Sequence, residues 1–177
     1  MRIGIGCDHA GFPLKLAVVL ALKKFGYGVV DYGCAGPERT DYPLVAARVA
    51  QAVSKREIPK GILFCGTGIG MSIVANKFRG VRAAVAWSPR VARLAAEHNH
   101  ANVLCFSGRF LPSSKVSGLL RAWLMAPMGR GRHARRVRQI LRLERGPCAK
   151  PRRTVPKGSP VRMHRALSRA GTRDWRR

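Results

Sequence analysis

Short apolar runs, rich in β-branched residues, alternate with amphipathic stretches through the first three quarters of the chain. The runs predict five strands, at residues 2–6, 28–32, 61–65, 81–86 and 102–106. The stretches between them predict helices at residues 13–25, 43–54, 71–77 and 89–98, three of which begin at a proline. This strict alternation predicts an α/β fold, a Rossmann-like three-layer sandwich around a five-stranded parallel sheet.

Two more helices are expected after the last strand, at residues 112–125 and 132–143, and the second is amphipathic and basic. Beyond Gly146 the chain has four prolines, scattered basic residues and no sustained periodicity. That composition is typical of disorder. We therefore expect a folded domain at residues 1–145 and a basic, mostly disordered C-terminal extension at residues 146–177.

Composition narrows the class of protein. Of the 177 residues, 46% are apolar and 24% are charged, which excludes general disorder. The longest apolar run, residues 16–22, is far shorter than the roughly 20 residues of a membrane span, so no membrane partner is expected. The first residues lack the apolar core of a secretory signal, which predicts a cytoplasmic protein. The five cysteines include no C-x-x-C pair, so free thiols are expected, without a disulfide framework or a zinc site.

The charge is unevenly distributed along the chain. There are 34 Lys and Arg against 8 Asp and Glu, a net charge of +26, and the last 50 residues carry 17 basic and 2 acidic side chains. A basic tail is typical of proteins that contact nucleic acid or an anionic surface. Because this tail has one aromatic residue, Trp175, and no nucleic-acid motif, only nonspecific nucleic-acid contact by the tail stays open as a hypothesis.

Candidate chemistry lies in the segments that follow the predicted strands. Ligands of open α/β sheets collect at the carboxyl ends of the strands. Asp8 and His9 follow the first strand, Cys65 and a glycine-rich loop follow the third, and His98 to His100 come one helix after the fourth. We expect all of these groups to meet at one edge of the sheet.

The glycine-rich loop constrains the ligand. Gly66, Gly68 and Gly70 lie between a predicted strand and a predicted helix, where backbone N–H groups favour an anion or a developing oxyanion. The G-x-G-x-G spacing is neither a dinucleotide fingerprint nor a P-loop, which disfavours a cofactor. A tight strand-to-helix turn explains the glycines equally well. Cys65 directly precedes the loop, where the positive end of a helix stabilises a thiolate and favours a general base or a nucleophile.

The remaining polar groups have simpler interpretations. Asp8 is best placed to cap the following helix. His98 and His100 are two residues apart and point in different directions, so at most one of them faces a common site. Neither these histidines nor their neighbours have the spacing of a metal site, and we expect no metal.

Taken together, several blocks of sequence resemble ribose-5-phosphate isomerase type B, the family that also includes the allose and galactose 6-phosphate isomerases. The resemblance covers residues 1 to about 145 and is carried by IGCDHAGFPLK, TDYP, GILFCGTGIGMSIVANK, GVRAAVAW, ARLAAEHNHANVLCFSGR and GRHARRVRQI. It implies a Rossmann-like fold and cofactor-free interconversion of ribose 5-phosphate and ribulose 5-phosphate. It also implies a homodimer, or a dimer of dimers, whose active sites take residues from both subunits.

The resemblance assigns roles in an enediolate mechanism. Cys65 is the base, His98 opens the sugar ring, and the backbone from Gly66 through Ile69 to Gly70 binds the enediolate. Thr67 adds a hydroxyl contact. The groups that hold the sugar hydroxyls and the open chain are Asp8, Tyr42 and Asn99.

For the phosphate of the substrate, the resemblance points to His9, Arg109, Arg132 and Arg136. Arg132 and Arg136 are four residues apart, so they share one helix face and can grip one phosphate, although a solvated basic face explains them without a ligand.

Two positions depart from the family pattern. His100 stands where family members often carry Asp or another small polar residue, and Trp87 stands where His or another polar residue is common. Trp87 follows the fourth strand and is placed to narrow a pocket there. Since pocket length decides between a pentose and a hexose, an isomerase of a hexose 6-phosphate such as allose 6-phosphate is the alternative. A nucleic-acid-binding protein built on the same scaffold is a more distant one.

Overall fold

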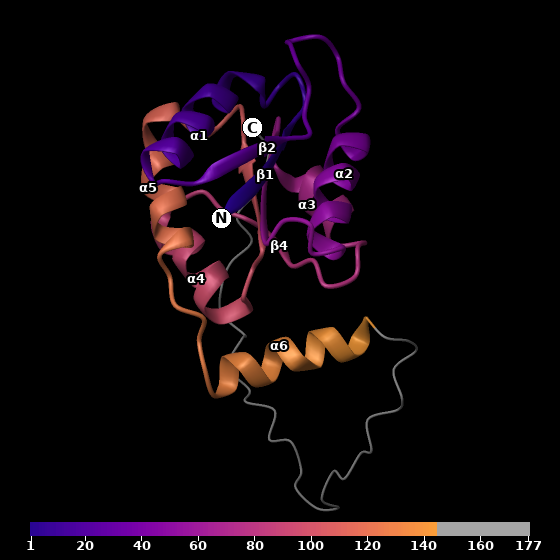
Figure 1. Ribbon diagram of the computed structural model, residues 1–177, viewed down its shortest axis with the longest axis vertical. Coiled ribbons are helices and arrows are strands. Elements are labelled where there is room, and N and C mark those ends of the chain that lie inside the picture. Colours follow the sequence, from indigo (N-terminus) through magenta and orange to yellow (C-terminus); the bar gives the residue numbers. More distant parts are fainter. Residues whose placement is uncertain (145–177) are drawn as a thin grey trace, which may run out of the picture. The chain divides into compact units, whose positions relative to one another are not determined.

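A parallel sheet forms the centre of the protein, as the computed structural model describes it for residues 1–144 (Figure 1). Its strands are β1 (Arg2–Cys7), β2 (Gly28–Asp31), β3 (Lys60–Cys65), β4 (Ala83–Val85) and β5 (Val103–Ser107). They lie in the order β2-β1-β3-β5-β4, and every neighbouring pair is parallel. The predicted five-stranded parallel sheet and Rossmann-like layout are therefore confirmed.

Helices cover both faces of the sheet. They are α1 (Phe12–Lys24), α2 (Tyr42–Ser54), α3 (Ile69–Ala75), α4 (Pro89–Asn99), α5 (Ser113–Leu124) and α6 (Arg132–Leu143). Figure 1 shows α1, α4 and α5 on one face and α2 and α3 on the other. α6 packs against α4. Of the residues described, no helix is long and apolar enough to cross a membrane.

The core has two halves, one on each face of the sheet. Along β3, Ile62 and Phe64 belong to the half under α1, α4 and α5, while Leu63 and Cys65 belong to the half under α2 and α3. Successive side chains of a strand point to opposite faces, so a strand covered on both sides must be apolar throughout. This is why the strands appear in the sequence as continuous apolar runs.

Most elements lie within one residue of their predicted bounds, and two differ by more. α3 begins at Ile69, two residues before the expected start, because Gly68 takes a φ of 78° and begins the helix at once. β4 spans three residues, where six were expected. Side chains take the place of a longer ladder there, since Asn102 Oδ1 accepts from Arg82 N at 2.7 Å and Asn76 Oδ1 accepts from Ala83 N at 2.8 Å. The predicted extension at residues 146–177 lies outside the described residues.

Candidate active site

The order of the strands creates a switch point between β1 and β3. The chain runs from β1 to β2 on one side and then returns to place β3 on the other side of β1. Ligands of such sheets bind outside the carboxyl ends of the two strands at this point. Asp8 leaves β1 and Cys65 ends β3 here, and Asp8 N donates to Phe64 O at 3.2 Å, so the two segments begin side by side.

The loop after β3 turns a backbone N–H toward the Cys65 thiol. Gly68 N donates to Cys65 Sγ at 3.2 Å, and the thiol is 5% exposed. Gly68 has a left-handed backbone, and a Cβ there would lie 2.8 Å from Phe106 O, so the turn requires glycine for both reasons. The loop is thus a tight strand-to-helix turn and also a donor to the thiol. The tight strand-to-helix turn is thus confirmed, whereas anion binding by the loop stays a prediction.

The segment after β5 supports this loop. Gly108 N donates to Cys65 O and Ser107 Oγ donates to Gly66 O, both at 2.7 Å. Arg109 N donates to Gly66 O at 3.2 Å, and a Cβ built on Gly66 would lie 3.3 Å from Arg109 Nε. The guanidinium of Arg109 therefore lies directly over the glycine loop. It gives this edge of the sheet a fixed positive charge.

The other wall of the site is an open cleft of about 760 Å³. It is lined by Asp8, His9, Arg39, Thr40, Asp41, Tyr42, Pro43 and Leu44. Asp8 is buried, and its Oδ1 accepts from Gly11 N at 2.8 Å. Because Gly11 is the N-cap of α1 and no side chain caps this helix, the capping role expected of Asp8 is wrong, and Asp8 closes the turn before the helix instead. His9 Nδ1 accepts from Thr40 N at 3.4 Å.

Tyr42 joins the cleft to the glycine loop. It begins α2, and its ring lies against Gly70, because a Cβ built there would be 2.7 Å from the ring atoms Cε2 and Cζ. Thr40 is a member of this wall that was not assigned a role from the sequence. The sequence signal for Thr40 was its place in TDYP, two residues before Tyr42.

A second group of predicted site residues lies at the opposite, amino edge of the sheet. It consists of His98, Asn99, His100, Arg132 and Arg136. His98 lies at the C-terminal end of α4. Four residues later in the chain, Asn102 O accepts from Gly61 N at 2.9 Å, close to the start of β3. A helix between parallel strands carries the chain from their carboxyl ends back to their amino ends. The expectation that His98, Asn99 and His100 lie at the same edge of the sheet as Cys65 is therefore wrong.

The amino-edge group has its own internal structure. Asn99 O accepts from Arg82 Nε at 3.2 Å, and His100 caps α4 in a left-handed conformation, with Nε2 bonded to Gly129 O at 2.9 Å. Arg132 and Arg136 lie in the first turns of α6, four residues apart on one helix face, and both are exposed. His98 and His100 do point to different partners.

His133 is a member of this group that was not assigned a role from the sequence. Its ring stacks on the ring of His98 with centroids 4.0 Å apart and 13° between the planes. Partial desolvation lowers the pKa of His133, and the nearby His98, Arg132 and Arg136 lower it further. In the sequence, the position of His133 next to Arg132 in the motif GRH was the feature that could have marked it as a site residue.

Comparison with known proteins identifies the family. The sequence matches the family model described as Ribose/Galactose Isomerase over residues 3–140. The chain belongs to the ribose/galactose isomerase family. Within it, the ribose-5-phosphate isomerase B of Escherichia coli (strain K12) is 46% identical over 143 residues, which are 81% of this chain and 96% of the relative.

Solved structures of family members have the same fold. Ribose-5-phosphate isomerase B of Clostridium thermocellum superposes with a TM-score of 0.79 at 45% identity, covering 81% of this chain and 97% of that one. The Mycoplasma genitalium ribose-5-phosphate isomerase B, solved with bound ribulose-5-phosphate, gives 0.78 at 40% identity, covering 82% and 97%. The resemblance noted in the sequence is confirmed.

Two features bear on how this family member binds its ligand. Within residues 1–144, no three His, Cys, Asp or Glu side chains gather as a metal site would require. Trp87 follows β4 at the same edge as Cys65, but its side chain is 70% exposed and is not part of the wall around Asp8 and His9. In a single chain, then, Trp87 does not narrow this cleft.

Proposed function

We propose that the protein interconverts ribose 5-phosphate and ribulose 5-phosphate through an enediolate, with no metal or redox cofactor. The observation that carries the proposal is the Cys65 thiol, which receives the Gly68 N–H at 3.2 Å beside the cleft that holds Asp8 and His9. An aldose-ketose isomerase needs a base next to an oxyanion pocket; in the proposal the Cys65 thiol is the base, and the glycine loop beside it forms the pocket. Similarity to the ribose-5-phosphate isomerase B of Escherichia coli supports the choice of substrate.

In the proposed reaction, His98 first opens the furanose ring by protonating the ring oxygen. Cys65 then takes the proton from C2 of the open aldose, and the negative charge passes to O1 of the enediolate. Backbone N–H groups between Gly66 and Gly70, with the Thr67 hydroxyl, stabilise that charge. A proton then adds to C1 and the O2–H proton moves to O1, so that C2 becomes the carbonyl carbon of the ketose. Each well-placed donor of this kind contributes about 3 to 4 kcal/mol in comparable sites.

The other groups bind the substrate without changing it. Asp8 and Tyr42 hold sugar hydroxyls, and Asn99 hydrogen-bonds the open chain. His9, Arg109, Arg132 and Arg136 surround the phosphate, where the two α6 arginines can each offer a forked pair of donors. A phosphate clamp of this kind fixes the far end of the substrate so that C2 lies against Cys65.

The proposal includes a second copy of the chain. Cys65 and the glycine loop are at the carboxyl edge of the sheet, whereas His98, Asn99, Arg132 and Arg136 are at the amino edge. Neither set forms a complete isomerase site alone. We therefore expect a homodimer, or a dimer of dimers, in which the amino edge of one subunit faces the carboxyl edge of the next. A thiol base also favours a reducing compartment such as the cytoplasm.

The test is a steady-state assay of the purified full-length protein with ribose 5-phosphate and with allose 6-phosphate. We expect kcat/KM to be higher for the pentose. Cys65→Ala should lower turnover by about 10²- to 10⁴-fold, the usual contribution of a general base. Cys34→Ala is the matched control, because it removes a thiol from the same edge but the opposite face of the sheet, and it should retain activity.

Two results would contradict the proposal in different ways. Retained activity in Cys65→Ala would exclude this thiol as the base. A kcat/KM that favours allose 6-phosphate would favour the hexose alternative, for which the family description, Ribose/Galactose Isomerase, is the supporting observation.

A further inference from the structure

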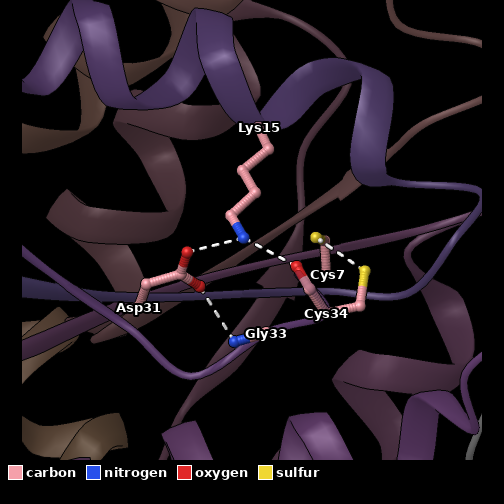
Figure 2. Close-up of polar contacts among 5 residues, drawn as sticks. All are labelled: Cys7, Lys15, Asp31, Gly33 and Cys34. Carbon is pink, nitrogen blue, oxygen red and sulfur yellow. Dashed lines mark hydrogen bonds and ion pairs between the residues drawn. The ribbon is translucent and has the colours of Figure 1, made fainter. Parts of the chain in front are cut away.

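A second pair of thiols lies at the carboxyl edge, apart from the proposed base. Cys7 ends β1 and Cys34 follows β2, and their sulfur atoms are 3.4 Å apart (Figure 2). Cys7 is fully buried and Cys34 is half-buried, both on the face of the sheet covered by α1. Cys65 belongs to the other face. The pair is therefore a separate chemical feature.

The backbone places the two cysteines on adjacent extended segments. Tyr32 N donates to Ile5 O at 2.8 Å, and Cys34 N donates to Cys7 O at 3.2 Å, so the pairing of β1 with β2 continues as far as Cys34. Neighbouring strands lie about 4.8 Å apart, and the Cα atoms of disulfide-bonded cysteines lie about 4.4 to 6.8 Å apart. The two thiols can thus be joined without moving the backbone far.

Three polar contacts hold the segment that carries Cys34. Lys15 Nζ donates to Cys34 O at 2.7 Å and pairs with Asp31 Oδ2 at 2.6 Å, and Asp31 Oδ1 accepts from Gly33 N at 2.9 Å (Figure 2). The approach also requires glycine at position 33, because a Cβ there would lie 2.5 Å from Cys7 N. The sulfur of Cys34 is therefore fixed against that of Cys7.

We propose that Cys7 and Cys34 form a reversible disulfide, with a small-molecule disulfide such as glutathione disulfide as the oxidant. The Cys34 thiolate attacks one sulfur of glutathione disulfide and releases one glutathione. Cys7 then loses its proton and attacks Cys34 Sγ, which releases the second glutathione. Two protein thiols are oxidised by two electrons, one glutathione disulfide is reduced to two glutathiones, and no other reactant is needed.

The order of the two attacks follows from burial. Burial raises the pKa of the Cys7 thiol, and its hydrogen bond with Cys34 raises it further, so Cys7 is a poor first nucleophile. Cys34 is the more accessible of the two and meets the oxidant first. Cys7 then acts as the resolving thiol over a distance that the fold has already closed.

The bond would fasten a wall of the cleft. The segment after Cys34 continues to Arg39, Thr40 and Tyr42, which line the cleft opposite Asp8 and His9. A disulfide between cysteines 27 positions apart also restricts the unfolded chain. The oxidised protein should therefore resist unfolding, while the Cys65 thiol, on the other face of the sheet, stays free.

The experiment equilibrates the full-length protein in a series of glutathione to glutathione disulfide ratios and quenches it in acid. Trypsin then gives peptides of residues 3–15 and 25–39, each with a single cysteine. We expect these two peptides to be linked in the oxidised samples and separate after reduction. The melting temperature should rise on oxidation by on the order of 5 to 10 °C.

Variants locate the effect. Cys34→Ser should lose the linked peptide and the redox-dependent shift in melting temperature, whereas Cys148→Ser, the matched control, should keep both. The wild-type peptide map needs no variant to fold, so it decides the matter by itself. Absence of the 3–15 to 25–39 link at excess glutathione disulfide, or a link from Cys34 to a different cysteine, would overturn the proposal.

Discussion

At the scale of single residues, Gly70 sets the position of Tyr42. A methyl group at position 70 would lie 2.7 Å from two atoms of the tyrosine ring, so the ring must turn aside. Gly70 has no positive φ, so alanine suits the α3 backbone there. We expect Gly70→Ala to fold normally and to lower kcat/KM for ribose 5-phosphate on the order of 10- to 100-fold. Steady-state kinetics with a melting curve checks this, and an unchanged kcat/KM would show that Tyr42 does not touch the substrate.

His133 introduces a pH dependence of stability. Partial desolvation and the charges of His98, Arg132 and Arg136 lower its pKa in the folded protein, while Glu97 opposes them. The unfolded chain therefore binds a proton more readily at this position. The contribution of this group to the free energy of unfolding is fully present above the ordinary histidine pKa of about 6.5. It must then decline as the pH falls below that value.

The corresponding variant is His133→Gln. We expect the wild-type melting temperature to fall between about pH 7 and pH 5, and to fall less in the variant, because the shifted group is gone. Melting curves across this range measure the difference. Parallel pH profiles for the two proteins would mean that other groups cause the decline.

At the scale of elements, α5 contains a glycine with no local reason to be there. Gly118 lies inside the helix on its exposed side, and the nearest atom to a Cβ built on it is Pro89 Cγ at 3.8 Å, an ordinary contact. Gly118→Ala should raise the free energy of unfolding by about 0.5 to 1 kcal/mol, since alanine loses less backbone entropy in a helix. Urea denaturation measures it. Replacement of glycine by alanine crowds Tyr42 at position 70 but should be harmless at position 118. Destabilisation by Gly118→Ala would contradict the open surroundings of Gly118.

The elements themselves follow from the sequence because each obeys one dominant periodicity. Apolar runs such as residues 61–65 predict buried strands, and the proline starts at Pro13, Pro43 and Pro89 predict helix beginnings. Boundaries were missed where other groups decide them. Side-chain amides shorten β4, and a left-handed Gly68 starts α3 early.

The site was predictable in part, for a topological reason. Asp8 directly follows β1 and Cys65 is the last residue of β3, so their meeting follows from parallel pairing alone. His98 follows a helix instead, and the helix returns it to the far edge. The contact of Cys7 with Cys34 depends on the register that pairs Ile5 with Asp31, which periodicity does not encode. The stack of His133 on His98 depends likewise on how α6 packs against α4.

At the scale of the whole molecule, the two half-sites allow a complementation test of the proposed dimer. Cys65→Ala damages the carboxyl edge and His98→Ala damages the amino edge, so each protein alone should be nearly inactive. Co-expressed subunits form mixed dimers in which one site receives both intact edges. We expect recovery of up to about a quarter of wild-type activity, since half of the dimers are mixed and each has one good site.

The control for complementation is a mixture of Cys65→Ala with Gly70→Ala. Both changes lie at the same edge, so a mixed dimer gains no site with two intact edges. Recovery in this mixture as well as in the first, or in neither, would contradict sites shared between subunits.

The packing of α6 also determines how the chain fluctuates. Among the described residues, α6 buries only Val137, and clefts of about 740 and 610 Å³ lie beside Leu141 and Ile140. Hydrogen bonds hold the chain at both ends of α6. Before the helix, Gly129 N donates to Glu97 O at 2.8 Å, and after it Gly80 N donates to Glu144 Oε2 at 2.9 Å. A twelve-residue helix with so little burial is marginal in water. In a separated subunit of the proposed dimer, its amide hydrogens should exchange with solvent long before those of β3, so the helix that carries Arg132 and Arg136 would become fully ordered only as the proposed dimer assembles.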